Sequence, residues 1–159
     1  MRGIRGIAVL ALLLGAPAAH ADPCSLTIES NDLMQFSARE LAVPPDCTTV
    51  EVTLRNVGKL PARVMGHDWV LAKEGDLPAI VNAGLAAGLA HGYVAANDPR
   101  VVAATRLVGG GESATVQFST AALVPGGRYA FFCSSPGHSS VMRGRFVFGG
   151  SGRLAQASK

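Results

Sequence analysis

Charged residues are scarce in this chain, and apolar runs long enough to span a membrane are absent. Only 16% of the 159 residues are Asp, Glu, Lys or Arg, and only 6% are aromatic. No segment reaches the ~18 uninterrupted apolar residues that a transmembrane helix needs. These shortages argue against a membrane anchor and against a highly charged disordered or coiled-coil chain. A hydrophobic fraction of 48%, with 19 Gly and 9 Pro, predicts instead one compact, turn-rich domain.

The N-terminus has the pattern of an export signal. Arg2 and Arg5 precede an apolar run from Ile7 to Leu14, and Ala19-His20-Ala21 has the small-x-small form of a cleavage site. We therefore predict a signal peptide over residues 1–21, cut after Ala21, and a mature protein in the periplasm. Its removal leaves 12 basic and 11 acidic residues, so the net charge falls from +3 to +1. No basic surface that would point to nucleic acid is expected.

Short segments with β-type alternation recur between Gly, Pro and Asn turns, which is typical of a Greek-key β-sandwich or barrel. The predicted strands are 26–28, 49–54, 64–71, 114–118, 128–132 and 143–148. Residues 76–90 break the pattern, because their apolar side chains recur at helical spacing. The sequence therefore predicts an all-β domain over residues 22–148 with one short helix packed outside it. The tail, residues 149–159, has little to bury and is expected to be flexible.

The mature chain has three cysteines, so at least one stays unpaired if the others form a disulfide. Cys24 and Cys47 lie in the N-terminal third, whereas Cys133 lies in a loop with other metal-binding side chains. The economical prediction is a Cys24–Cys47 disulfide with Cys133 left as a metal thiolate. The alternative, a disulfide from Cys133 to either of the others, would leave the neighbours of Cys133 unexplained.

The loop from Cys133 to Met142 places a thiol, the imidazole of His138 and a thioether within ten residues. Soft donors of this kind favour copper over zinc or magnesium. A second imidazole, His67, lies far upstream. Two imidazoles, one thiolate and a weak axial Met form the ligand set of a blue-copper site. Each residue also has a plainer interpretation, with His67 as a hydrogen-bonded histidine, Met142 as core filler and Cys133 as an inert buried thiol.

Over nearly all of its mature length the chain resembles the azurins, bacterial periplasmic blue-copper proteins of the cupredoxin family. The resemblance rests on the early Cys pair, on Met65-Gly-His-Asp-Trp69, on the helical insertion and on the Cys-x4-His-x3-Met spacing. It implies that His67, Cys133 and His138 form a trigonal ligand set around one copper ion, which cycles between Cu(II) and Cu(I). It further implies a distant axial Met142, the Gly66 carbonyl on the opposite axial side, and Trp69 in the core.

Three positions depart from the pattern of that family. Asp68 stands where azurins usually have Asn, and as a carboxylate it would either be protonated or lower the reduction potential. Ser135 replaces a loop Phe and is expected to leave the thiolate surroundings more exposed. Asn56 replaces a titrating His that many azurins have. Asp68, Ser134 and Ser135 are expected to surround the ligands without binding the metal.

The resemblance implies a monomeric electron carrier whose partners are redox proteins such as c-type cytochromes or a periplasmic reductase. The matching apolar docking surface around His138 comprises Met34, Leu60, Val64, Met65, Leu85 and Val141. Two other classes compete with this interpretation. A multicopper enzyme commonly has His directly after the ligand Cys, where this chain has Ser134, so an enzyme is not expected. A periplasmic copper-delivery protein without an electron-transfer role is the alternative.

Overall fold

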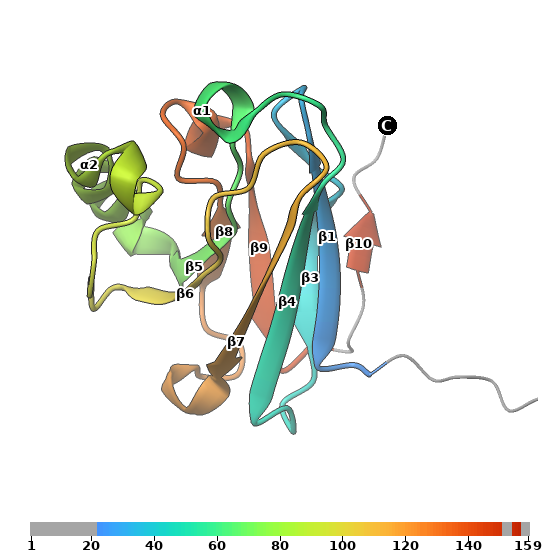
Figure 1. The fold of residues 1–159 in the computed structure, drawn as a ribbon. Coiled ribbons are helices and arrows are strands. Elements are labelled where there is room, and N and C mark those ends of the chain that lie inside the picture. Colours follow the sequence, from blue (N-terminus) through green and yellow to red (C-terminus); the bar gives the residue numbers. More distant parts are fainter. Residues whose placement is uncertain (1–21, 151–153, 157–159) are drawn as a thin grey trace, which may run out of the picture.

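Two β-sheets pack face to face in the computed structural model, which describes residues 22–150 and 154–156 (Figure 1). The four-stranded sheet has the order β2-β1-β4-β7, and the six-stranded sheet has the order β10-β3-β9-β8-β5-β6. The first sheet comprises β1 (Ser25–Asn31), β2 (Gln35–Phe36), β4 (Thr49–Asn56) and β7 (Ser113–Ser119). The second comprises β3 (Ala38–Val43), β5 (Val70–Lys73), β6 (Val101–Ala104), β8 (Tyr129–Phe132), β9 (Arg143–Phe148) and β10 (Leu154–Gln156). The predicted β-sandwich with a short helical insertion is confirmed.

Both sheets are mixed. Strand β1 runs parallel to β4, and β3 runs parallel to β9, whereas β4–β7, β5–β8 and β8–β9 are antiparallel. In β4 the side chains of Val50, Val52 and Leu54 point into the core. This alternation is what the sequence pattern of the strand predicts. Parallel neighbours need crossover connections, so the chain passes between the two sheets instead of forming a simple series of hairpins.

Trp69 lies at the centre of the core, fully buried. Its ring centroid lies 6.1 Å from that of Phe131, 6.2 Å from that of Phe118 and 6.3 Å from that of Phe146. These aromatic side chains come from both sheets and supply much of the apolar area that the sandwich buries. The position of Trp69 two residues after His67 fixes that histidine at the edge of a rigid core.

One predicted strand is wrong in its first half. Residues 62–65 form a short helix, α1 (Ala62–Met65), and the strand β5 begins only at Val70. The backbone N–H groups of Val64 and Met65 both donate to the carbonyl of Pro61, which closes a helical turn. The side chain of Val64 is 59% exposed. The apolar pattern there predicts a strand, but these residues form a turn at the surface.

The predicted helical insertion is confirmed as α2 (Leu77–Ala87), flanked by single turns η1 (Glu74–Asp76) and η2 (Leu89–His91). Ile80 packs on the outer face of the six-stranded sheet against Val70, Ala72 and Phe132. The helix ends at Gly88, whose φ of 75° is a conformation that favours glycine. Within the described residues no helix is both long and apolar enough to cross a membrane.

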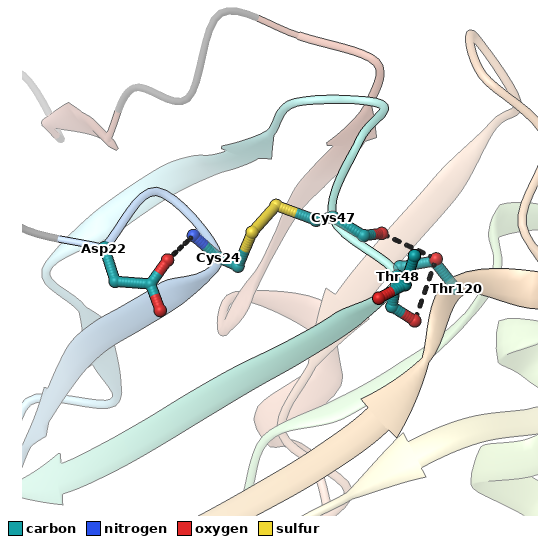
Figure 2. The surroundings of a disulfide bond; sticks show 5 residues. All are labelled: Asp22, Cys24, Cys47, Thr48 and Thr120. Atoms are coloured by element: carbon teal, nitrogen blue, oxygen red, sulfur yellow. Dashed lines mark hydrogen bonds between the residues drawn. A yellow bond between two sulfur atoms is a disulfide. The ribbon is translucent and has the colours of Figure 1, made fainter.

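The predicted disulfide between Cys24 and Cys47 is present, with the two Cα atoms 5.6 Å apart (Figure 2). It joins the start of β1 to the connection between β3 and β4. The Thr120 hydroxyl, just after β7, donates to the carbonyl of Cys47 at 2.7 Å. Cys133 is free and buried, so the alternative pairings are wrong. We call this part of the sandwich the disulfide end.

The predicted signal peptide, residues 1–21, lies outside the described residues, as do residues 151–153 and 157–159 of the predicted tail. Within that tail, Leu154–Gln156 form β10, which pairs antiparallel with β3. This pairing was not expected from the composition of the tail.

Candidate metal centre

His67 is held by backbone hydrogen bonds at the end of the sandwich opposite the disulfide. Its N–H donates to the carbonyl of Val108 at 3.0 Å, and the N–H of Val108 donates back at 2.8 Å. The preceding residue, Gly66, leaves no room for a side chain, since a Cβ atom there would lie 2.3 Å from the carbonyl oxygen of Ala62. The chain can therefore pass from α1 into β5 with His67 facing inward only if residue 66 is glycine.

Cys133 follows β8 directly, and the loop that it opens folds back on itself. Gly137, with φ of 81°, reverses the chain, and η4 (His138–Ser140) follows. The N–H of Cys133 donates to the carbonyl of Met142 at 3.0 Å, and the N–H of Met142 donates to the carbonyl of His138 at 2.7 Å. These bonds place the three potential ligands of the loop side by side. In Figure 1 this loop and α1 lie at the same end of the sandwich, which we call the donor end.

The three predicted trigonal ligands converge. The Cys133 Sγ atom lies 3.8 Å from Nδ1 of His67 and 3.5 Å from Nδ1 of His138. All three donor atoms lie within 4.8 Å of one another, and all three side chains are buried. Met142, at the end of the same loop, is fully buried as well. The plainer interpretation of His67 as an isolated strand-end histidine does not account for this convergence.

The orientation of the His67 ring suits a metal at Nδ1. Its Nε2 atom lies 2.9 Å from the carbonyl oxygen of Asn31. Because a carbonyl can only accept, Nε2 carries the proton and Nδ1 keeps its lone pair, which faces the sulfur. Nothing in the sequence points to Asn31, because a contact through a backbone carbonyl leaves no signal in the residue type.

Burial also keeps the two imidazoles in the unprotonated form that can bind a metal. Desolvation lowers the pKa of His67, opposed by the bond to Asn31, and desolvation lowers the pKa of His138. Both rings are therefore neutral near pH 7, which is the form that binds a metal. Burial in the first place, and the nearby carboxyl of Asp68 in the second, raise the pKa of the Cys133 thiol. A cation that replaces the thiol proton would remove this cost.

Asp68 connects the segment of His67 to the loop of Cys133. Its Oδ1 accepts from the N–H of Ser134 at 2.7 Å, and its Oδ2 accepts from the Ser134 hydroxyl at 2.5 Å. Burial raises the pKa of Asp68 to about 6, against the opposing effect of the hydrogen bonds from Ser134. The carboxyl thus fixes the two chain segments relative to each other. The sequence predicted its place beside the ligands, and the structure adds Ser134 as its partner.

Ser135 does not open the site as expected. The side chain of Cys133 is 0% exposed, and Ser135 itself is only 5% exposed. The Ser135 hydroxyl donates to the carbonyl oxygen of Gly66 at 2.7 Å. A buried hydrogen bond therefore holds the Ser135 side chain inside the protein, and the sulfur stays covered although residue 135 is small. Asn56 is buried too, and its side chain accepts from the N–H of Gly58 and donates to the carbonyl of Val108.

The residues of the predicted docking surface are mostly accessible. Five of them are between 37% and 59% exposed, namely Met34, Leu60, Val64, Leu85 and Val141, whereas Met65 is half-buried. Val141 directly follows η4, and Val64 belongs to α1, so both lie at the donor end. Leu85 belongs to α2, on the outer face of the six-stranded sheet.

Comparison with known proteins agrees with the donor set. The family model described as "Copper binding proteins, plastocyanin/azurin family" matches residues 22–149. Azurin from Achromobacter denitrificans is 47% identical over 139 residues, which cover 86% of this chain and 93% of that protein. Azurin from Bordetella pertussis is 45% identical over 87% of this chain and 91% of its own length. Azurin from Pseudomonas aeruginosa is 41% identical over 91% of this chain and 96% of its own length.

Proposed function

Since the chain belongs to the plastocyanin/azurin family of copper-binding proteins, we propose that it carries single electrons by means of one copper ion. The ligands would be Nδ1 of His67 and of His138, the Cys133 thiolate and the Met142 thioether, and the Gly66 carbonyl is the further candidate donor that the resemblance implies. The observation that carries this proposal is the convergence of a buried sulfur and two ring nitrogens within 4.8 Å. Soft sulfur with imidazole suits copper in both of its common oxidation states.

The role of the protein is to hold the ligand side chains in fixed positions. Copper, when bound, takes up and releases one electron by alternating between Cu(II) and Cu(I). His67 is held by the Asn31 carbonyl, and the Cys133 loop is held through Ser134 by Asp68. None of these bonds uses a ligand atom of the proposed site. The donors therefore keep their geometry as the charge changes, which favours fast exchange.

The alternative, copper delivery, differs in what happens to the metal. A carrier retains copper through many redox cycles, whereas a delivery protein releases it to an acceptor. We propose to cycle the copper-loaded protein between ascorbate and ferricyanide in the presence of a Cu(I) chelator. Full retention of copper after many cycles supports electron transfer, and loss of copper within the first few reductions supports delivery. We propose no catalytic activity, because Cys133 is followed by Ser134 and not by a His that could bridge to a second copper.

We further propose that the protein is exported to the periplasm and cut after Ala21. The N-terminal pattern supports export, and the Cys24–Cys47 disulfide suits an oxidising compartment. The mass of protein purified from the periplasm of an expressing bacterium tests this directly. A chain that begins at Asp22 agrees with the proposal, and an uncut chain in the cytoplasm contradicts it.

The proposed partners are redox proteins, such as c-type cytochromes or a periplasmic reductase, that meet a monomer at the exposed apolar side chains around His138. An apolar surface without strong charge suits brief encounters of small area. Val141, next to η4 and 46% exposed, is the most direct probe of this surface. Val141→Asp is expected to slow electron exchange with a c-type cytochrome while the absorption of the site stays unchanged. An unchanged rate would move the docking surface elsewhere.

A further inference from the structure

The hydrogen bond from Ser135 to Gly66 joins the metal-binding loop to the residue before His67. Both residues are buried, and the oxygen atoms lie 2.7 Å apart. The carbonyl of Ser135 accepts from the N–H of His138 at 3.0 Å, so the backbone of Ser135 is tied to the loop as well. Pro136 follows and restricts the conformations open to Ser135. The hydroxyl is therefore aimed at a fixed acceptor.

The acceptor is fixed in turn. A Cβ atom at Gly66 would collide with the carbonyl oxygen of Ala62, so the backbone there has one close-packed arrangement. A carbonyl oxygen has two lone pairs, and a buried hydrogen bond engages one of them and fixes the direction of the oxygen, which weakens it as a donor to a metal ion. Carbonyl oxygen is a hard donor that suits divalent ions, whereas thioether sulfur suits Cu(I). The hydrogen bond from Ser135 to the Gly66 carbonyl therefore weakens the oxygen donor relative to the thioether of Met142.

We propose that Ser135 is a positioning residue that withholds the Gly66 carbonyl from the metal and leaves Met142 as the effective axial donor. This inference rests on the proposed copper ligand set. It follows that Ser135 favours Cu(I) over Cu(II) and favours copper over zinc at this site. A side chain without a hydroxyl at position 135 releases the carbonyl to act as an additional oxygen ligand.

A competing acceptor for the hydroxyl is the sulfur itself. Although burial raises the pKa of the Cys133 thiol, the N–H and hydroxyl of Ser135 oppose that effect. The hydroxyl has a single proton, and the carbonyl at 2.7 Å has the geometry of a full hydrogen bond. The two acceptors are distinguishable in the metal-free protein, because only one of them involves the Gly66 carbonyl carbon.

The first test therefore uses no metal. The variants are Ser135→Ala, which removes the hydroxyl, and Ser135→Thr, which keeps it. Ser140→Ala is the matched control, because the Ser140 hydroxyl also donates to a loop carbonyl at 2.7 Å but is exposed. In the metal-free protein labelled with ¹³C, Ser135→Ala is expected to shift the Gly66 carbonyl resonance, with Ser135→Thr close to the unmodified chain and no shift in Ser140→Ala. An unshifted resonance in Ser135→Ala would overturn the proposal and favour the sulfur as acceptor.

The second test compares metals. In Ser135→Ala the affinity for Zn²⁺ relative to Cu(I) is expected to rise roughly fivefold, a factor that corresponds to the net free energy of one hydrogen bond. The reduction potential of the copper-loaded variant is expected to fall. Ser135→Thr is expected to restore both values, and Ser140→Ala to leave them unchanged. Equal zinc-to-copper selectivity and potential in Ser135→Ala, with the blue absorption intact, would overturn the proposal while leaving the proposed function standing. An unmodified chain without blue absorption would overturn the proposed function as well, even if the carbonyl resonance shifts.

Discussion

The two ends of the sandwich are closed in opposite ways. At the disulfide end a covalent bond between Cys24 and Cys47 joins two chain segments, and the Thr120 hydroxyl satisfies the carbonyl of Cys47. At the donor end a free cysteine, Cys133, lies buried beside two neutral imidazoles and a carboxyl. Both ends hold distant parts of the chain together. The disulfide end is held by a covalent bond and needs no metal, whereas the buried donor atoms at the donor end have the arrangement of a metal site.

The difference shows how one fold separates stability from function. A disulfide stabilises by constraining the unfolded chain and does not respond to pH over the neutral range. Buried polar groups such as His67 and Asp68 cost free energy unless hydrogen bonds or a metal ion compensate them. We infer that the disulfide end helps to offset the cost of keeping the donor end preorganised. Changes at the two ends should therefore have separable effects.

The largest expected effect is at the donor end. Cys133→Ser replaces the thiolate with a hydroxyl that binds copper weakly, so the blue absorption should disappear completely. Most of the stabilisation that copper gives to the folded protein should be lost with it, because that stabilisation grows with the logarithm of the ratio of the copper concentration to the dissociation constant. Visible spectra and urea unfolding with and without copper measure both effects. Strong blue absorption that survives this substitution would contradict the ligand assignment.

At the disulfide end we expect a loss of stability without a change in the visible spectrum. Cys24→Ala together with Cys47→Ala opens a loop with a sequence separation of 23 residues, which in the chain-entropy model costs roughly 3 kcal/mol. The visible spectrum of the copper-loaded variant should stay unchanged, because the disulfide lies at the far end of the sandwich. Urea unfolding provides the free energy. A changed spectrum in folded protein would show that the two ends are coupled.

The donor end should also make the stability of the metal-free protein depend on pH, through the carboxyl of Asp68. Burial raises the pKa of this carboxyl from 3.8 to about 6, so between these values the folded state binds more protons than the unfolded state. The metal-free protein should therefore lose stability from Asp68 as the pH rises through about 4 to 6, by at most about 3 kcal/mol. The pKa values of His67 and His138 are lowered, so below about pH 6.5 the unfolded state binds more protons at these residues than the folded state does. Their contribution to stability therefore increases as the pH rises, opposite to that of Asp68.

The comparison with Asp68→Asn isolates the contribution of the carboxyl. The difference in unfolding free energy between this variant and the unmodified chain should grow in favour of the variant as the pH rises from 4 to 7. In the copper-loaded protein the same substitution should raise the reduction potential, since it removes a negative charge beside the metal. A pH-independent difference would show that Asp68 titrates at its ordinary value.

The sequence predicted those parts of the molecule whose signal is local. The alternation in β4 and the spacing of Cys133, His138 and Met142 within one loop were sufficient to predict a strand and a metal-binding loop. The pairing of Cys24 with Cys47 followed from the oxidising compartment and from the separate role of the third cysteine.

Features that depend on tertiary contacts were not predictable in this way. The sequence of strand β3, Ala-Arg-Glu-Leu-Ala-Val, does not alternate and so does not predict a strand, whereas the apolar residues of the turn α1 do predict one. The partner of His67 is a backbone carbonyl of Asn31, which no residue type reveals. The bond from Ser135 to Gly66 joins residues 69 positions apart. The chemistry of the donor set and the resemblance to a known family both connected His67 to the distant loop, but neither predicts the contacts that hold the two segments together.

The smallest expected effect at the metal centre comes from the axial position. Met142→Ala removes a weak donor but leaves the thiolate and both imidazoles, so copper should remain bound and the protein should stay blue. The reduction potential should change, because the axial ligand tunes it. Voltammetry of the copper-loaded variant measures the change. A potential equal to that of the unmodified chain would place Met142 in the core only.

The most direct test of the central claim is the visible spectrum of the purified protein titrated with Cu²⁺, with Zn²⁺ as the colourless control. The account predicts an intense thiolate-to-copper band that saturates at one copper per chain and disappears reversibly on reduction. Weak absorption, or saturation at more than one equivalent, would contradict a single copper bound by Cys133 and two histidines.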